Sequence, residues 1–218
     1  MAALCILQGG TMKLIIAEKP SVALSIAKVV GASSRKDGYI QGNGYMVSWC
    51  VGHLIQMASP DKYDEKYAKW NLDDLPILPK DFKYEVYKKK KKQYGVLKKL
   101  LHLKEVDTVI NACDAGREGE LIFRLVYEEA KCKKPIKRLW ISSMEDEAIR
   151  KGIESLASGK DFENLFENAK SRAIADWLVG MNLSRLYSCL YNQNYSVGRV
   201  QTPTLSMIAE RDSEISSF

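Results

Sequence analysis

The chain of 218 residues lacks a long apolar run and the common glycine-rich nucleotide motifs. No apolar stretch approaches the roughly 20 residues that a membrane-spanning helix requires, so no membrane span is expected. The segment 1–11 contains a short apolar patch without a basic start, so it is not interpreted as a signal peptide, and Met12 is a candidate natural start. Because neither a Gly-Lys-Ser/Thr loop nor a Gly-x-Gly-x-x-Gly pattern is present, nucleotide hydrolysis and dinucleotide binding are unsupported.

Cysteine and histidine are too scattered to indicate a metal cluster. The five cysteines stand singly, with no close pair among them. Isolated thiols are typical of a reducing cytoplasm, where cysteine behaves as a small apolar residue. The two histidines, His53 and His102, are also isolated, and we predict a structural role for both because metal sites need grouped ligands.

Lysine is concentrated in two parts of a chain whose net charge is +6. An unbroken run covers residues 88–92, and a second cluster consists of Lys131, Lys133, Lys134, Lys137 and Arg138. A solvated surface is the ordinary explanation of such runs. Binding to a polyanion such as nucleic acid is the alternative, and charge alone does no more than favour it.

Apolar periodicity predicts strands that alternate with helices up to about residue 155. The expected strands are 13–17, a hairpin within 38–54, 107–112 and 136–141. The expected helices are 21–30 with Ser21 as its cap, 93–103, 119–130 and 145–157. This alternation is typical of an α/β fold in which helices flank a parallel-type sheet.

The rest of the chain has a different character. Residues 59–82 contain three of the six prolines, so a surface connection is predicted there, anchored by Tyr63, Tyr67 and Trp70. A helical pattern covers residues 161–191, and a final helix is predicted from Thr202 as cap and Pro203 as its first residue. We therefore predict an α/β domain over 12–155 and a partial helical domain over 156–218, which looks cut inside its last helix.

Two short acidic clusters, residues 17–21 and 114–120, each follow a predicted strand and open a predicted helix. The carboxyl ends of parallel strands form the crevice in which α/β sheets bind ligands, and helix N-termini favour phosphate. Carboxylates brought close together repel one another, and bound Mg²⁺ removes that repulsion. Glu18, Asp114 and Glu118 are the candidate ligands. The alternative is that each acid only stabilises a helix dipole, but two such clusters favour the metal site.

Polar residues beside these acids, and near the C-terminal end, suit a phosphodiester ligand. Lys19 and Arg117 are interleaved with the acids, where they can hold a phosphate or simply form ion pairs. Arg172 and Asp176 share a helix face and can pair with each other. Around the start of the final helix lie four polar residues that could grip a backbone phosphate: Arg199, Gln201, Thr202 and Thr204. Helix capping explains Thr202 but not Arg199 or Gln201.

Four motifs, in this order, resemble those of the type IA DNA topoisomerases, and most closely those of the bacterial topoisomerase III group. They are Ile15-Ile16-Ala17-Glu18-Lys19-Pro20-Ser21, Gly52-His53-Leu54, Asp114-Ala115-Gly116-Arg117-Glu118-Gly119-Glu120 and Gly198-Arg199-Val200-Gln201-Thr202-Pro203-Thr204-Leu205. The resemblance runs from about residue 13 to the end of the chain. It implies a Toprim domain followed by the first part of the helical domain that lines a single-stranded DNA groove.

The resemblance also implies a mechanism and a set of roles. In this family a tyrosine attacks DNA to form a 5′-phosphotyrosine link, another strand passes through the break, and the break is resealed without ATP. Glu18 would manage the proton on the leaving 3′-oxygen, Lys19 would steady the scissile phosphate, and Glu18, Asp114 and Glu118 would bind Mg²⁺. The implied DNA-binding residues are Arg117, Arg172, Asp176, Arg199, Gln201 and Thr202. A bacterial, cytoplasmic, nucleoid-associated protein without membrane contact is expected.

Two departures from the family pattern limit what this chain is expected to do. Gly116 stands where the general Toprim pattern has a second aspartate, which predicts weaker or differently shared metal binding. The family's nucleophilic tyrosine lies in a later domain, and none of the eleven tyrosines here is in its motif. We therefore expect the remaining domains beyond Phe218, and no DNA cleavage by these residues alone.

Two other classes of protein remain open from the sequence. A Toprim nuclease or a primase-type phosphotransferase would share the acidic clusters but would not explain the segment 199–205. A non-catalytic DNA-binding module would use the basic clusters without needing paired acids.

Overall fold

The computed structural model describes residues 11–218, which form two compact units. Unit 1 contains the described residues up to Gln56 together with Tyr84–Ala169, and unit 2 contains Met57–Lys83 and Lys170–Phe218. The apolar patch of the first residues, with Cys5, lies outside the described part. Within residues 11–218 no helix is both long and apolar enough to cross a membrane.

Unit 1 is built on a seven-stranded sheet with the strand order β2-β3-β4-β1-β7-β8-β9. The strands are β1 (Met12–Ala17), β2 (Ser34–Lys36), β3 (Tyr39–Gly42), β4 (Tyr45–Trp49), β7 (Val106–Ala112), β8 (Ile136–Arg138) and β9 (Ala157–Ser158). The four central strands, β4, β1, β7 and β8, are parallel, and the outer strands pair antiparallel. The predicted α/β fold is confirmed, with a mixed sheet.

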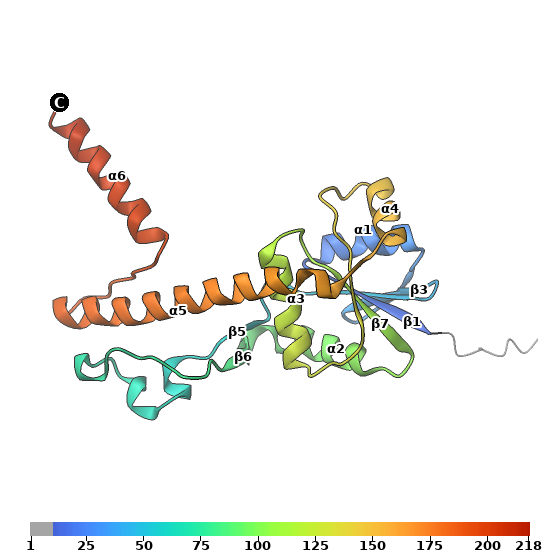
Figure 1. Cartoon of the computed structure of the whole chain (residues 1–218), viewed down its shortest axis with the longest axis horizontal. Coiled ribbons are helices and arrows are strands. Elements are labelled where there is room, and N and C mark those ends of the chain that lie inside the picture. Colours follow the sequence, from blue (N-terminus) through green and yellow to red (C-terminus); the bar gives the residue numbers. More distant parts are fainter. Residues whose placement is uncertain (1–10) are drawn as a thin grey trace, which may run out of the picture. The chain divides into compact units, whose positions relative to one another are not determined.

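Four helices cover the two faces of this sheet (Figure 1). On one face lie α1 (Pro20–Val30) and α4 (Asp146–Glu154), and on the other lie α2 (Lys91–His102) and α3 (Arg117–Glu129). Side chains alternate along β1, so Ile15 and Ala17 share a buried core with Ile26 of α1 and Ile149 of α4. Burial of such side chains stabilises the fold by about 1.5 to 3 kcal/mol each.

Helix α1 begins directly beside the first acidic cluster. Its cap position is Lys19, with extended backbone and no side-chain capping bond, and Pro20 follows as the first helical residue. The prediction of Ser21 as cap is therefore wrong, because the proline, which has no N–H to satisfy, already occupies the first turn. The first turn carries no acidic residue, and the helix ends at Gly31 in the left-handed conformation, with φ 75°.

The predicted hairpin is formed by β3 and β4. Its turn has two residues with positive φ, Asn43 at 47° and Gly44 at 76°, the conformation that tight hairpins require. After this turn, β4 pairs with β1 in parallel. At the end of the pair, the Cys50 N–H donates to the Ala17 carbonyl at 2.8 Å. The hairpin thus places the end of β4 beside the end of β1, where the first acidic cluster begins.

Some predicted boundaries differ from the observed ones. Strand β8 ends at Arg138 rather than at residue 141, and α4 ends at Glu154. A further strand pair, β5 (Ile55–Met57) and β6 (Tyr84–Val86), stands at either end of the segment 57–83. The 3₁₀ turns of unit 1 are η4 (Lys88–Lys90) and η5 (Gly159–Phe162).

Unit 2 consists of the segment 57–83, most of the long helix α5 (Glu163–Tyr191) and α6 (Gln201–Ser216). The segment contains three 3₁₀ turns, η1 (Pro60–Lys62), η2 (Glu65–Ala68) and η3 (Leu72–Asp74). It is fixed to α5 by the Asn182 side chain, whose oxygen accepts from the Ile77 N–H at 2.6 Å and whose amide donates to the Ile77 carbonyl at 3.0 Å. Tyr63, a predicted anchor, places its ring 5.8 Å from that of Trp177.

The domain boundary near residue 155 stays a prediction. The two compact units divide the chain at other positions, because residues 57–83 belong to the same unit as most of α5 although they lie early in the sequence. Sequence order alone does not show such a return, since the bonds from Asn182 to Ile77 join residues 105 positions apart.

Candidate metal and phosphate site

The acidic edge is formed where three parallel strands end side by side. Ala17 of β1 is in register with Trp49 of β4 and with Ala112 of β7. The residues that follow these strands, Cys50, Glu18 and Cys113, therefore lie in one row, and Asp114 comes next. The structure thus brings the two acidic clusters to the same edge of the sheet, the usual ligand-binding edge of parallel sheets.

Lys19 lies between the carboxylates of the two clusters. Its Nζ atom is 3.7 Å from Oε1 of Glu18 and 3.9 Å from Oδ2 of Asp114. The Glu18 side chain is 12% exposed, whereas that of Asp114 is 53% exposed, so one carboxylate is largely shielded and the other faces solvent. Charge at this edge is therefore arranged as two acids around one cation.

Glu118 has a different partner. It lies in the first turn of α3, and its Oε2 atom is 3.5 Å from Nε2 of His53. The predicted structural role of His53 thus includes contact with a candidate site residue, which its isolation in the sequence did not indicate. Arg117, the first residue of α3, is exposed.

The loop that carries His53 is held from two sides. The Gly52 N–H donates to the Glu18 carbonyl at 3.4 Å, and Gly52 has a φ of 61°, which favours glycine. The Nζ atom of Lys90 donates to the carbonyls of Val51 at 2.6 Å and His53 at 2.8 Å. One lysine of the basic run is therefore a structural clamp beside the acidic edge and not part of a solvated face.

Two glycines of the second acidic cluster have opposite surroundings. A Cβ atom on Gly119 would lie 2.2 Å from the Asp114 carbonyl oxygen, so only glycine lets α3 start this close to Asp114. A Cβ atom on Gly116 would meet nothing within 4 Å. Gly116 has extended backbone, with φ 177°, which any residue adopts. The close approach therefore depends on Gly119 alone.

A buried network of ion pairs joins α3, β7 and β8 beneath the acidic edge. Glu120 is 0% exposed, and its carboxylate lies 3.1 Å from Nε of Arg138 and 3.0 Å from Nε of Arg124. The Asn111 amide donates to the same carboxylate at 2.8 Å. Arg138 also donates to the carbonyls of Cys113 and Asp114, each at 2.7 Å. Burial lowers the pKa of Arg138, and the Glu120 charge opposes that change. The backbone of Asp114 is thus anchored to a fixed internal charge.

Sequence reasoning did not identify this network. In the sequence, Arg138 belongs to a basic cluster for which a solvated surface or polyanion binding is expected, and Glu120 belongs to the second acidic cluster without an assigned role. The one signal in the sequence is an arginine within the predicted strand 136–141. A charged side chain on a buried strand is almost never fully buried without a partner, so Arg138 would have indicated an internal acid beside it.

The row of strand ends also contains two buried thiols. Cys50 is 0% and Cys113 is 3% exposed. Hydrogen bonding with Cys50, and then burial, raise the pKa of Cys113 well above its usual value. Both cysteines are buried and act as small apolar residues at the strand ends, which agrees with the predicted apolar role of cysteine.

The carboxylates suit Mg²⁺ in chemistry without forming a closed metal cage. Among residues 11–218, no three His, Cys, Asp or Glu side chains gather closely enough to hold an ion by themselves. Mg²⁺ is commonly held by one or two carboxylates, several waters and substrate phosphates. The exposed carboxylate of Asp114 fits this kind of open site, whereas the Lys19 ammonium beside it suits the phosphate and not the metal ion.

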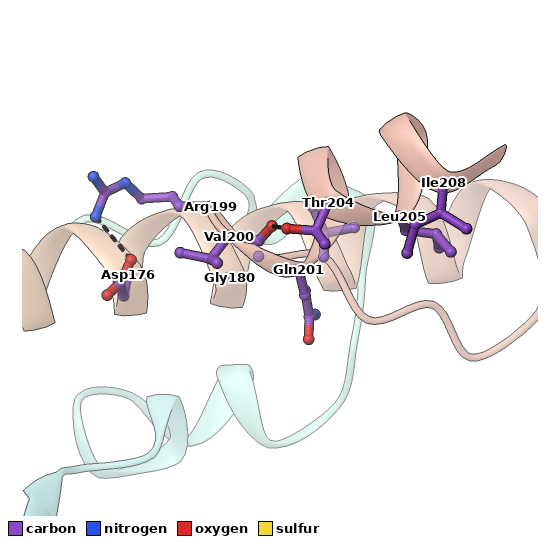
Figure 2. A pocket seen from close by; sticks show the side chains of 10 residues that line it. Asp176, Gly180, Arg199, Val200, Gln201, Thr204, Leu205 and Ile208 are labelled. Atoms are coloured by element: carbon purple, nitrogen blue, oxygen red, sulfur yellow. Dashed lines mark hydrogen bonds and ion pairs between the residues drawn. The ribbon is translucent and has the colours of Figure 1, made fainter. Parts of the chain in front are cut away.

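In unit 2, the predicted phosphate-binding residues each bond to a neighbouring residue, as Figure 2 shows for Arg199 with Asp176. Arg199 donates from Nη1 to Oδ1 of Asp176 at 2.8 Å. Nε of Arg172 lies 3.7 Å from the other oxygen of that carboxylate. The Gln201 amide donates to the Ser196 hydroxyl at 2.9 Å. The predicted pairing of Arg172 with Asp176 is confirmed, and Arg199 joins the same carboxylate.

The start of α6 differs from the prediction. The cap position is Val200, and the first helical residue is Gln201, so Thr202 is not the cap. The Thr202 hydroxyl instead accepts from the Gly198 N–H at 3.1 Å. The Thr204 hydroxyl donates to the Val200 carbonyl at 2.8 Å. Beside this turn lies an open hollow of about 670 Å³, whose lining includes Asp176, Arg199 and Gln201.

The fold and the acidic edge define a Toprim-type domain, and comparison with known proteins agrees. The chain belongs to the Toprim domain family, which matches residues 13–144. Residues 160–218 match a second family, described as DNA topoisomerase. These matched ranges end and begin on either side of residue 155.

Similar proteins are topoisomerases. The chain is 47% identical over 204 residues to DNA topoisomerase 3 of Bacillus subtilis, and 48% identical over 204 residues to that of Bacillus licheniformis. Each alignment covers 94% of this chain and 28% of the relative. Among solved structures, full-length topoisomerase I from Thermotoga maritima matches with a TM-score of 0.64 and 27% identity, over 94% of this chain and 31% of that one. The resemblance drawn from the four motifs is confirmed, and the chain spans about 28% of the length of these relatives.

Proposed function

We propose that this chain supplies the acidic site, and part of the single-stranded DNA groove, of a type IA DNA topoisomerase like topoisomerase III. The observation that carries the proposal is the position of Lys19 between Glu18 and Asp114 at the ends of adjacent parallel strands. Names of the relatives support DNA as the substrate. A bacterial, cytoplasmic and nucleoid-associated location stays a prediction.

The roles are those that the resemblance to type IA topoisomerases implies, and the exposure and charge of the residues support them. Lys19 steadies the scissile phosphate with its ammonium group, since a cation favours an adjacent phosphodiester. Glu18, largely shielded, exchanges a proton with the 3′-oxygen that leaves when a tyrosine outside these residues forms the 5′-phosphotyrosine link. The two acids and the lysine thus form the half of the active site that handles the leaving group.

Asp114 and Glu118, with Glu18, would hold Mg²⁺ at this edge. When bound, Mg²⁺ offsets the charge of the carboxylates and the phosphate. Gly116 in place of a second aspartate leaves one ligand fewer, so we expect Mg²⁺ binding that is weaker, or shared differently among the ligands, than in Toprim domains with both aspartates. DNA contacts are assigned to Arg117, Arg172, Asp176, Arg199, Gln201 and Thr202.

The metal assignment is tested by calorimetric titration of the chain with Mg²⁺. Asp114→Asn should weaken binding at least about tenfold, because it removes a charged oxygen ligand. Asp107→Asn is the matched control, since Asp107 is an exposed acid near the opposite end of β7 and should leave the titration unchanged. Equal effects of the two substitutions would contradict the assignment.

The strand-cutting half of the reaction gives a second test. The chain alone should not relax negatively supercoiled DNA, because no tyrosine here lies in the family's nucleophile motif. Relaxation by the purified chain would overturn this proposal. Mg²⁺-dependent hydrolysis of single-stranded oligonucleotides would instead favour the Toprim nuclease alternative.

A further inference from the structure

The C-terminal end of α5 and the turn after it expose three neighbouring tyrosines. Tyr187 is 41% exposed, Tyr191 62% and Tyr195 43%. The ring centroids of Tyr187 and Tyr191 are 6.3 Å apart with planes only 2° from parallel, and the Tyr195 ring stands 5.7 Å from that of Tyr191 at 63°. Unit 2 therefore exposes a contiguous series of three rings, of which the first two are parallel and the third is inclined to the second.

The turn that carries Tyr195 is fixed by backbone and hydroxyl bonds. The Ser188 hydroxyl accepts from the Tyr195 N–H at 2.9 Å and donates to the Tyr195 carbonyl at 3.3 Å. The Gln193 N–H donates to the Ser188 carbonyl at 3.2 Å, and Asn192 has a φ of 52°. Because the turn is held in place, Tyr195 is positioned before any ligand arrives.

A hollow of about 340 Å³ lies at the same end of α5. Three consecutive amides line it, those of Asn192, Gln193 and Asn194, together with Trp70, which is 47% exposed. The Arg185 guanidinium lies 5.4 Å from the Trp70 ring centroid, so this indole is held by a cation. Amides offer both donors and acceptors, which is what the edges of nucleobases require.

The charge pattern indicates which kind of ligand this surface suits. No charged residue occurs between Arg185 and Arg199. Arg185 is 5% exposed and engaged by the Trp70 ring and the Tyr67 carbonyl, so the exposed surface offers aromatic rings and uncharged amides. Such a surface matches a flat, neutral, hydrogen-bonding partner such as a base better than it matches a phosphate. A helical stacking pair alone would explain Tyr187 and Tyr191 but not the fixed Tyr195 beyond the helix end.

We propose that Tyr187, Tyr191 and Tyr195 form a stacking platform for unpaired bases of single-stranded DNA, whose edges the amides of residues 192–194 bind. The inference rests on the proposed function, because the chain runs from Tyr195 directly into the segment 198–205 to which DNA contacts are assigned. Aromatic platforms of this kind bind single strands with little dependence on sequence. The platform holds bases, whereas the arginines near residue 199 hold the backbone.

The test is fluorescence anisotropy of the wild-type chain with labelled oligothymidylate and with the same backbone carrying abasic sites. The wild type should bind the thymidine strand more tightly than the abasic strand. Tyr191→Ala should weaken thymidine binding on the order of tenfold and leave abasic binding unchanged, because one stacked base is lost. Tyr191→Phe should retain binding, since the ring remains.

Leu190→Ala is the matched control, because Leu190 is the exposed neighbour on the same helix, at 56%, and has no aromatic face. It should leave both affinities unchanged. Equal wild-type affinity for the two strands, an unaffected Tyr191→Ala variant, or an equal loss in Leu190→Ala would overturn the platform while leaving the proposed function in place. Failure of the wild type to bind either strand would overturn both.

Discussion

The acidic edge of unit 1 and the segment 198–205 of unit 2 both present exposed polar side chains, but the residues that hold them in place differ in how deeply they are buried. The acidic edge is held by a buried ion pair between Glu120 and Arg138, whose side chains are 0–1% exposed. The segment 198–205 leads into α6, and no residue of that helix is buried. The first site is therefore fixed by the packing of a whole sheet, whereas the second depends on a few local bonds at the surface.

The largest expected effect tests the buried ion pair. Arg138→Met should lower the free energy of unfolding by about 3 to 5 kcal/mol, because it leaves Glu120 buried without one of its charged partners. Urea denaturation measures the change. Arg211→Met, which removes an exposed ion pair with Glu214, should change stability by less than about 1 kcal/mol. A similar small loss in both variants would show that the two supports do not differ as described.

The next effect concerns the approach of α3 to Asp114. Gly119→Ala should cost about 1 to 3 kcal/mol, because its Cβ atom would overlap the Asp114 carbonyl and push the helix away. Thermal unfolding by circular dichroism reports the loss. Gly116→Ala serves as the comparison, and its stability should stay within about 0.5 kcal/mol of the wild type, since open space surrounds that position. Equal losses would mean that Gly119 is not the critical contact.

A smaller and more local effect is expected for the Lys90 clamp. Lys90→Met removes the donors to Val51 and His53 and should cost about 1 kcal/mol. Hydrogen exchange should become faster in residues 51–53 but not in the central strands, because the loop is released while the sheet remains. Lys89→Met, at an exposed position of the same run, should change neither stability nor exchange. Unaltered exchange in Lys90→Met would contradict the clamp.

The smallest effect is expected in unit 2. Asp176→Asn weakens the pairs with Arg172 and Arg199, yet the carboxylate is 42% exposed, so stability should fall by no more than about 1 kcal/mol. A double-mutant cycle with Arg199→Gln, repeated at high salt, measures the coupling. The coupling should shrink as salt rises, whereas a large, salt-independent value would show that this segment is supported as rigidly as the acidic edge.

Periodicity was sufficient to predict the parts of unit 1 that depend on neighbours in the sequence. Strands β1 and β7 and the helices that follow them were predicted because apolar residues recur at strand and helix spacing. The shared edge of Glu18 and Asp114 followed from the rule that parallel strands end together. These features were predictable because each depends on a pattern within one element or on a general property of parallel sheets.

Contacts between distant residues were not predictable in the same way. Lys90 clamps His53 across 37 positions, and Arg124 donates to the Gly159 carbonyl across 35. Even the helix starts depended on their surroundings, since Pro20 displaced the predicted Ser21 cap and the Thr202 hydroxyl turned back to Gly198. A single sequence shows which residue types are present but not which of several equivalent lysines or threonines reaches a partner.

The missing side-chain cap of α1 has a consequence for the binding of a phosphate at this end of the helix. With no capping side chain and no acidic residue in the first turn, the helix starts with backbone N–H groups that no side chain of its own serves. A phosphate held by Lys19 would stand at this end of the helix and act as its cap. Binding of that phosphate would then stabilise the first turn of α1, whose buried face already packs against the sheet.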